Sequence, residues 1–296
     1  MIITPEFVLV NFPKTGSTFA RVMLSEIDRR RDQGRIAGLR RTLGLGRPFY
    51  RELMLPNLRR EGRRRHRSQH GTVAQIPERY RDRPVVCVVR NPFDRYVSQF
   101  RFGHWKHRPS TPQRDEIRDH FPAFPDLSFE QFLEFCEFER RRYRMAEVSP
   151  RSVFGLQTAQ FVRMVALRPA AMLNRLDAEH VASGDFVEDL PDLRLLRTDR
   201  LNEGLFQLLV GFGYDDEEVA FIRDQGRVLP PGGTERGVDD DWKSYYDPPL
   251  FERIRERERL LLRMYERLGV IESGEWDELV RPTVGSSFSG SSAIRR

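Results

Sequence analysis

The chain has 296 residues, of which 39% are hydrophobic and 11% aromatic, which is enough for a buried core. Its 50 basic and 44 acidic residues give a net charge of +6, a mild excess that favours anionic ligands without choosing among them. No stretch reaches the roughly 18 apolar residues of a membrane span and the two cysteines lack a zinc-site pattern, so we expect a soluble, cytoplasmic protein without a signal peptide.

The N-terminal segment predicts a strand, a tight loop and a helix. Residues 6–12, EFVLVNF, are almost continuously apolar, as in a strand buried on both faces of a parallel sheet. A helix is expected to begin near Ser17, with Phe19, Val22, Met23 and Ile27 on its apolar face.

The loop between them, PKTGSTFA at 13–20, has the residues of an anion site. Gly16 permits close approach of the backbone, and the amide groups at the helix start favour negative charge. Lysine is rare here (only Lys14, Lys106 and Lys243), and its compact charge suits a tight loop. The residues expected to bind the anion are Lys14, Thr15, Gly16, Ser17, Thr18 and Phe19. The same residues also fit a glycine turn with a serine cap and an exposed lysine.

Arginines crowd the following segment, residues 29–69, with few acidic residues between them. This composition is compatible with a mobile basic excursion, a lid or a pair of surface helices.

A second strand and helix follow at 84–89 and about 93–107, with Pro92 in the first turn. Arg90 ends the strand, and Ser98 follows eight residues later inside the helix. A guanidinium can pair two phosphate oxygens, so we expect Arg90 and Ser98 to bind one phosphate. The alternative is that Arg90 pairs with Asp94 while Ser98 bonds to its own helix. Cys87, inside the strand, fits a small buried residue.

The remainder of the chain continues the alternation of strands and helices. We expect helices at 128–147, 152–167, 201–213 and 247–269, and a strand at 192–198. The pattern predicts a three-layer α/β/α domain over 1–272 with a mostly parallel central sheet, whose ligands bind at the carboxyl ends of the strands. Residues 273–296, rich in serine and glycine, are expected to be disordered.

The two motifs together resemble those of the sulfotransferases that use 3′-phosphoadenosine 5′-phosphosulfate (PAPS). PKTGST is similar to their 5′-phosphosulfate loop, and RNPFDRYVS to their 3′-phosphate motif. ERGVDDDWKSYY at 235–246 is similar to a C-terminal family segment, although Glu235 stands where an arginine is usual.

The resemblance implies a P-loop-NTPase-like sulfotransferase fold and transfer of a sulfuryl group from PAPS to an acceptor hydroxyl or amine. It implies that Arg236 and Gly237 join Arg90 and Ser98 at the 3′-phosphate. Lys14 would supply the positive charge at the reacting group, so no metal is expected. The acceptor is open among carbohydrates, lipids, phenols and peptides, and no oligomeric state is predicted.

A histidine base would take the proton of the acceptor. Of the six histidines, His70 lies twenty residues before Arg90 and ahead of Ile76–Pro77, which is similar to the position of the family's catalytic histidine. His66 is the second choice, and a glutamate base, used by some members, is a further alternative.

Three other functions compete with this one. A P-loop kinase or NTPase fits the first strand, loop and helix, but the G-x-x-x-x-G-K-[ST] pattern is missing. A nucleic-acid-binding protein fits the arginines of 29–69, but no known binding module is present, so no specific nucleic acid is expected. A catalytically inactive relative that binds the nucleotide is the third.

Overall fold

The computed structural model of the chain describes residues 1–32, 50–56, 67–107, 114–142, 154–228, 241–273 and 275. The strands are β1 (Ile2–Ile3), β2 (Val8–Val10), β3 (Arg51–Glu52), β4 (Leu55–Pro56), β5 (Arg67–Ser68), β6 (Val85–Val89) and β7 (Leu193–Arg197). The helices are α1 (Ser17–Asp32), α3 (Pro92–Phe102), α4 (His104–His107), α5 (Arg114–His120), α6 (Phe129–Arg142), α7 (Leu156–Val165), α8 (Pro169–Arg175), α9 (Ala178–Ser183), α10 (Leu201–Gly211), α11 (Asp216–Val219) and α12 (Pro248–Arg267). Short 3₁₀ turns are η1 (Val73–Gln75), η2 (Glu78–Tyr80), η4 (Asp185–Asp189), η5 (Thr198–Arg200), η6 (Ala220–Ile222) and η7 (Trp242–Tyr245).

Five of the described strands form one mixed sheet in the order β3-β1-β2-β6-β7. β2, β6 and β7 are parallel, whereas β1 is antiparallel to both β2 and β3. The predicted parallel arrangement is found for β2, β6 and β7, but the sheet as a whole is mixed. The physical reason for the antiparallel part is the tight turn after β1, in which the Thr4 hydroxyl donates to the Phe7 carbonyl at 3.0 Å. A connection this short can join only antiparallel strands.

The register of the three parallel strands aligns their carboxyl ends. Val10 of β2 lies opposite Cys87 of β6, which in turn lies opposite Leu195 of β7. The segments that follow β2, β6 and β7 therefore meet at one edge of the sheet, where ligands of α/β folds bind.

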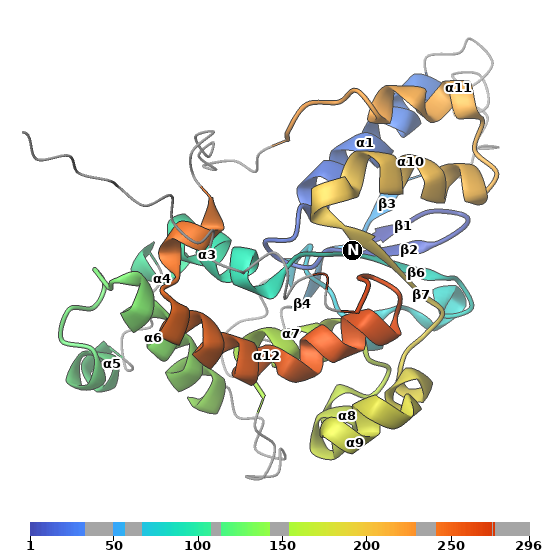
Figure 1. Cartoon of the computed structure of the whole chain (residues 1–296). Helices are drawn as coiled ribbons and strands as arrows, with labels where there is room; N and C mark the ends of the chain where they lie inside the picture. Colours follow the sequence, from blue (N-terminus) through green and yellow to red (C-terminus); the bar gives the residue numbers. More distant parts are fainter. Residues whose placement is uncertain are drawn as a thin grey trace, which may run out of the picture.

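Helices cover both faces of the sheet, so the α/β prediction is confirmed (Figure 1). On one face, α1 and α10 pack Phe19, Met23 and Leu205 against Leu9 and Val88. On the other face, α7 and α12 contribute an apolar cluster that includes the sheet side chains Val8, Val10, Val85, Cys87 and Val89 together with Phe161, Val162, Leu261 and Met264. The near-continuous burial of β2 and β6 explains why their sequences contain no polar alternation.

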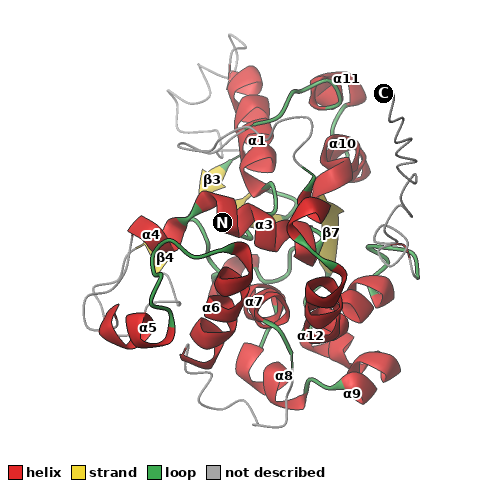
Figure 2. Ribbon diagram, turned by 60° about the vertical axis from the view of Figure 1, so that its left-hand side comes forward, coloured by secondary structure: helices red, strands yellow, loops and turns green. Residues whose placement is uncertain are grey.

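A third core, rich in aromatic residues, lies beside the sheet and includes α3, α6 and the start of α12 (Figure 2). The Phe93 ring stacks on Phe251 at 4.3 Å between centroids and on Trp242 at 5.8 Å. The Tyr246 hydroxyl donates to the Phe93 carbonyl at 3.0 Å. These contacts hold η7 against the beginning of α3, although the two elements lie far apart in the sequence.

Several expected elements need correction. The helix expected at 93–107 is interrupted at Gly103, whose φ of 58° ends α3 before α4 begins. The helix expected at 152–167 ends at Val165, and Pro169 begins the next helix, α8. Val22, expected on the apolar face of α1, is 41% exposed.

The arginine-rich segment 29–69 is not an excursion throughout. Its first residues complete α1, β3 joins the edge of the main sheet, and β4 pairs with β5 in a second sheet. Residues 33–49 and 57–66 lie outside the described residues, as do 274 and 276–296 of the expected tail. None of the helices in the described ranges is both long and apolar enough to cross a bilayer.

Candidate anion-binding site

The loop between β2 and α1 has a strained backbone. Lys14 has a φ of 65°, and no other non-glycine residue of the described ranges has a positive φ. Gly16 has a φ of 86°, and a Cβ there would lie 3.2 Å from Leu201 and 3.4 Å from Thr198. A left-handed lysine costs roughly 1–2 kcal/mol, and such strain concentrates at functional sites.

Four consecutive carbonyl groups of this loop each accept a hydrogen bond from a side chain. The pairs are Phe12 with the hydroxyls of Thr15 (2.8 Å) and Ser17 (3.1 Å), Pro13 with Arg95 Nε (3.0 Å), Lys14 with Arg90 Nη1 (3.4 Å), and Thr15 with the Thr198 hydroxyl (2.6 Å). A planar trans peptide places its N–H opposite its C=O, so the N–H groups of residues 14–16 are turned away from these donors. Successive backbone amides ahead of a helix start are a common type of anion site, so this loop is a candidate for one.

Three of the expected donors make hydrogen bonds within the loop. The Thr15 and Ser17 hydroxyls donate to the Phe12 carbonyl at 2.8 and 3.1 Å, and the Phe19 amide donates to the Gly16 carbonyl at 2.9 Å. These groups shape the loop, whereas Lys14, Gly16 and Thr18 are partly exposed.

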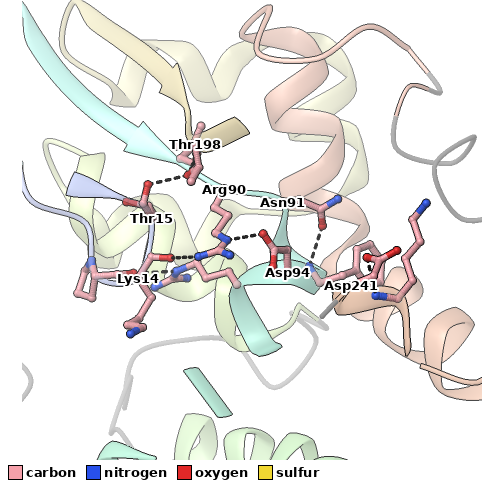
Figure 3. Close-up of polar contacts among 12 residues, drawn as sticks. Lys14, Thr15, Arg90, Asn91, Asp94, Thr198 and Asp241 are labelled. Atoms are coloured by element: carbon pink, nitrogen blue, oxygen red, sulfur yellow. Dashed lines mark hydrogen bonds and ion pairs between the residues drawn. The ribbon is translucent and has the colours of Figure 1, made fainter. Parts of the chain in front are cut away.

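Arg90 joins the second motif to the first (Figure 3). Its Nε lies 2.5 Å from Asp94 Oδ2, and its Nη1 lies 3.4 Å from the Lys14 carbonyl. Ser98 is half-buried and lies one turn beyond Asp94 on α3, hence on the same helix face. The Arg90–Asp94 ion pair, which the sequence offered as the alternative to phosphate binding, is therefore formed. With Nε held by Asp94, the other end of the guanidinium contacts the loop.

The Lys14 ammonium lies 3.9 Å from the centroid of the Phe102 ring. Phe102, on the last turn of α3, is 43% exposed. A cation over an aromatic face is attracted by about 0.5–1 kcal/mol when exposed, which is weak enough for an anion to displace.

His70 is tethered to the strand that leads into the loop. Its Nδ1 lies 2.8 Å from the carbonyl oxygen of Asn11. A carbonyl can only accept, so Nδ1 carries the proton and the neutral ring has its lone pair on Nε2. The Asn11 side chain also donates to the Gln69 carbonyl at 3.3 Å. His66 lies outside the described residues.

The third motif is described only in part. Arg236 and Gly237, together with Glu235, lie outside the described residues. Trp242 stacks on Phe93 beside the start of α3, and Lys243 is exposed. The described end of this segment therefore lies next to the helix that follows Arg90.

Sequence reasoning missed three residues of the site. Arg95 is 2% exposed and holds the Pro13 carbonyl, and Asn11 is fully buried and holds His70. Thr198 bridges β7 to the loop, with its hydroxyl 2.8 Å from the Val89 carbonyl as well. Asn11, a polar residue in an apolar strand, was the one signal visible in the sequence.

Other groups offer little chemistry of their own. Burial raises the pKa of the Cys87 thiol to about 12, so it remains protonated and unreactive. In the described ranges, no three His, Cys, Asp or Glu side chains are arranged to hold a metal ion. A hollow of about 540 Å³ runs from Thr198 and Leu201 along β7 to Val270. It shares Thr198 and Leu201 with the wall beneath Gly16.

No protein-family model matches this chain, and no curated protein matches it significantly.

Proposed function

We propose that this protein is a PAPS-dependent sulfotransferase with a P-loop-like sulfotransferase fold, which moves a sulfuryl group to an acceptor hydroxyl or amine. The observation that carries the proposal is the junction of two motifs that are 76 residues apart. Arg90 Nη1 contacts the carbonyl of Lys14, so a phosphate-pairing arginine and an anion loop adjoin. A nucleotide with phosphates at both ends of its ribose fits such a pair of sites.

In this proposal the loop binds the 5′-phosphosulfate. Lys14 leaves the Phe102 ring and contacts the bridging oxygen, where negative charge develops as the sulfur–oxygen bond breaks. The turned amides of the loop bind the departing 5′-phosphate. The positive charge is supplied by Lys14, and the contribution of the protein is positioning and electrostatics, as in phosphoryl transfer.

Arg90 and Ser98 bind the 3′-phosphate, and Arg236 and Gly237 complete that end. The Asp94 carboxylate holds Arg90 Nε at 2.5 Å and so restricts the guanidinium to one orientation. A preoriented guanidinium loses less side-chain entropy when it pairs with a phosphate.

His70 acts as the general base. The Asn11 carbonyl, three residues before Lys14, holds Nδ1 and leaves Nε2 as the basic nitrogen. Nε2 accepts the acceptor proton while the acceptor oxygen attacks sulfur in line with the leaving phosphate. The base and the loop thus depend on one strand end, β2, which fixes their separation.

Calorimetry with the purified chain tests the proposal. We expect 3′-phosphoadenosine 5′-phosphate (PAP), the desulfated product, to bind more tightly than adenosine 5′-phosphate, which lacks the 3′-phosphate. Arg90→Ala should weaken PAP binding about tenfold and leave adenosine 5′-phosphate unaffected. Tighter binding of ATP–Mg²⁺ than of PAP would instead identify a P-loop kinase or NTPase. Strongly salt-dependent binding of random oligonucleotides, without PAP binding, would identify a nucleic-acid-binding protein.

A further inference from the structure

Arg95 is a buried cation directly behind the anion loop. It lies in the first turn of α3 and is 2% exposed, and it is among the largest fully buried side chains of the described residues. Its guanidinium carbon lies 3.9 Å from the centroid of the Phe12 ring, at the end of β2. Burying a guanidinium costs free energy unless its N–H donors are paired. The hydrogen-bond partners of Arg95 therefore indicate what role the buried side chain has.

Each of the three guanidinium nitrogens of Arg95 donates to a different residue. Nη1 donates to Gln157 Oε1, and Nη2 donates to Gln160 Oε1 at 2.7 Å. Both glutamines belong to α7, which packs on the sheet. The third nitrogen, Nε, donates to the Pro13 carbonyl at 3.0 Å.

The two glutamines are themselves held in place. The Gln157 amide donates to Gln99 Oε1 at 3.0 Å, and the Gln99 amide donates to Gln160 Oε1 at 3.4 Å. Three side-chain amides from α3 and α7 are therefore linked, and two of them, Gln157 and Gln160, direct their oxygens at one guanidinium. Since a guanidinium is planar and rigid, fixing two nitrogens also fixes the direction of Nε.

We propose that Arg95 is a positioning residue for the anion loop, holding the Pro13–Lys14 peptide so that the Lys14 N–H faces the ligand. The bonded carbonyl faces the interior, and the N–H on the opposite side of that peptide faces outward. The contact also stabilises the left-handed conformation of Lys14, which the chain adopts at a net free-energy cost. Arg95 does not touch the ligand in this account. The account rests on the proposed function only for the identity of the anion.

A purely structural Arg95 would stabilise the core without affecting the loop. Tyr96→Phe provides the matched control, because Tyr96 is the next residue on α3 and its hydroxyl donates to the buried Glu258 at 2.6 Å. That change removes a buried hydrogen bond of similar quality but leaves the loop untouched. The test variants are Arg95→Met, which removes the donors, and Arg95→Lys, which keeps the charge with a single donor group.

The experiment measures PAP and pyrophosphate affinity of the full chain by calorimetry, below the melting temperature of each variant. Arg95→Met should weaken both ligands at least about tenfold. Arg95→Lys should weaken them about threefold, and Tyr96→Phe should stay within about twofold of wild type. In parallel, the amide NMR resonances of Lys14 and Gly16 should shift in Arg95→Met and not in Tyr96→Phe.

The outcomes separate this proposal from the proposed function. Unchanged affinity and unchanged Lys14 resonances in Arg95→Met, or in Arg95→Lys if the first variant does not fold, would overturn the positioning role. An equal loss in Tyr96→Phe would also overturn it. Pyrophosphate binding that depends on Arg95, without binding of PAP, would support the positioning role and refute the nucleotide assignment.

Discussion

Two buried charged groups meet neighbouring residues of α3 and serve different regions of the molecule: the Arg95 guanidinium on α3 itself, and the Glu258 carboxylate on α12. Arg95 contacts the Pro13 carbonyl at the base of the anion loop. Its neighbour Tyr96 donates instead to the Glu258 carboxylate, which is fully buried within the layer formed by α3, α7 and α12. Burying each charged group costs free energy, so the hydrogen bonds that the group makes must offset that cost.

The Glu258 carboxylate caps a helix from a distance. It accepts from the backbone amides of Gln157 at 3.0 Å and Thr158 at 2.8 Å, in the first turn of α7, and from the Thr158 hydroxyl at 2.7 Å. An added Cβ at Gly155 would lie 2.0 Å from its Oε1, so the backbone closes tightly around the carboxylate. Every contact of this cluster belongs to the interior.

The Arg95 cluster, in contrast, ends on a surface loop with strained backbone. Its glutamine partners are buried or half-buried, but its last contact orients a peptide that opens to ligand. The comparison indicates that a buried charge is structural when it satisfies the end of a packed helix. It is functional when it maintains a conformation that the loop would not adopt alone.

The strongest test of this distinction is Lys14→Ala. We expect turnover of PAPS, followed as release of PAP with a panel of hydroxyl acceptors, to fall about a thousandfold, because the charge on the leaving group loses its partner. The melting temperature should change little, since the contact of the Lys14 ammonium with the partly exposed Phe102 ring contributes about 0.5–1 kcal/mol. Lys106→Ala is the control, because Lys106 pairs with Asp126 on an exposed surface at 2.9 Å. Equal losses in both variants would contradict a role specific to the loop.

Glu258→Gln should do the opposite of Lys14→Ala: it should lower stability and leave ligand binding unchanged. The amide NH₂ of glutamine would face groups that now donate, so we expect a loss of about 3 kcal/mol in the free energy of unfolding. Affinity for PAP should remain unchanged while the protein is folded. Urea denaturation measures the loss, with Glu256→Gln as the control on the same helix. Glu256 is 73% exposed and pairs with Arg259 at 2.7 Å, so its replacement should cost less than about 0.5 kcal/mol.

His70→Ala tests whether β2 positions the base as well as the loop. We expect turnover to fall about a hundredfold, with the remaining rate no longer following the titration of a histidine. His120→Ala is the control, because its Nδ1 also contacts a backbone carbonyl, that of Glu116, at 3.0 Å, but on the distant helix α5. A wild-type pH–rate profile retained by His70→Ala would exclude His70 as the base.

The longer strands and helices around both buried charged groups were predictable from the sequence. The apolar runs of β2 and β6 and the amphipathic pattern of α12 each carry a local signal. The two-residue strands β1 and β3 carry none, since their pairing depends on residues about 50 positions apart. Neither could the sequence show that Arg95 reaches both Pro13 and Gln160, because that arrangement depends on how α3 packs against α7.

The smallest expected effect is the pH dependence that Glu258 gives to stability. Burial raises the pKa of Glu258 above the ordinary glutamate value, against the opposing effect of the donors around it. Between these two values the folded protein keeps a proton that the unfolded chain has released, so the free energy of unfolding falls as pH rises. The hydroxyls of Tyr96 and Thr158 can accept the proton of the neutral acid.

Urea denaturation of wild type and Glu258→Gln between pH 4 and pH 7 isolates this contribution, because all other groups titrate in both proteins. The advantage of wild type should shrink by less than about 1 kcal/mol as pH rises above about 4.5. An advantage that grows with pH would mean that the four donors outweigh burial and lower the pKa of Glu258. The cluster would then hold a permanent carboxylate, and the comparison would be between two buried ions rather than between an ion and a carboxyl group that can be neutralised.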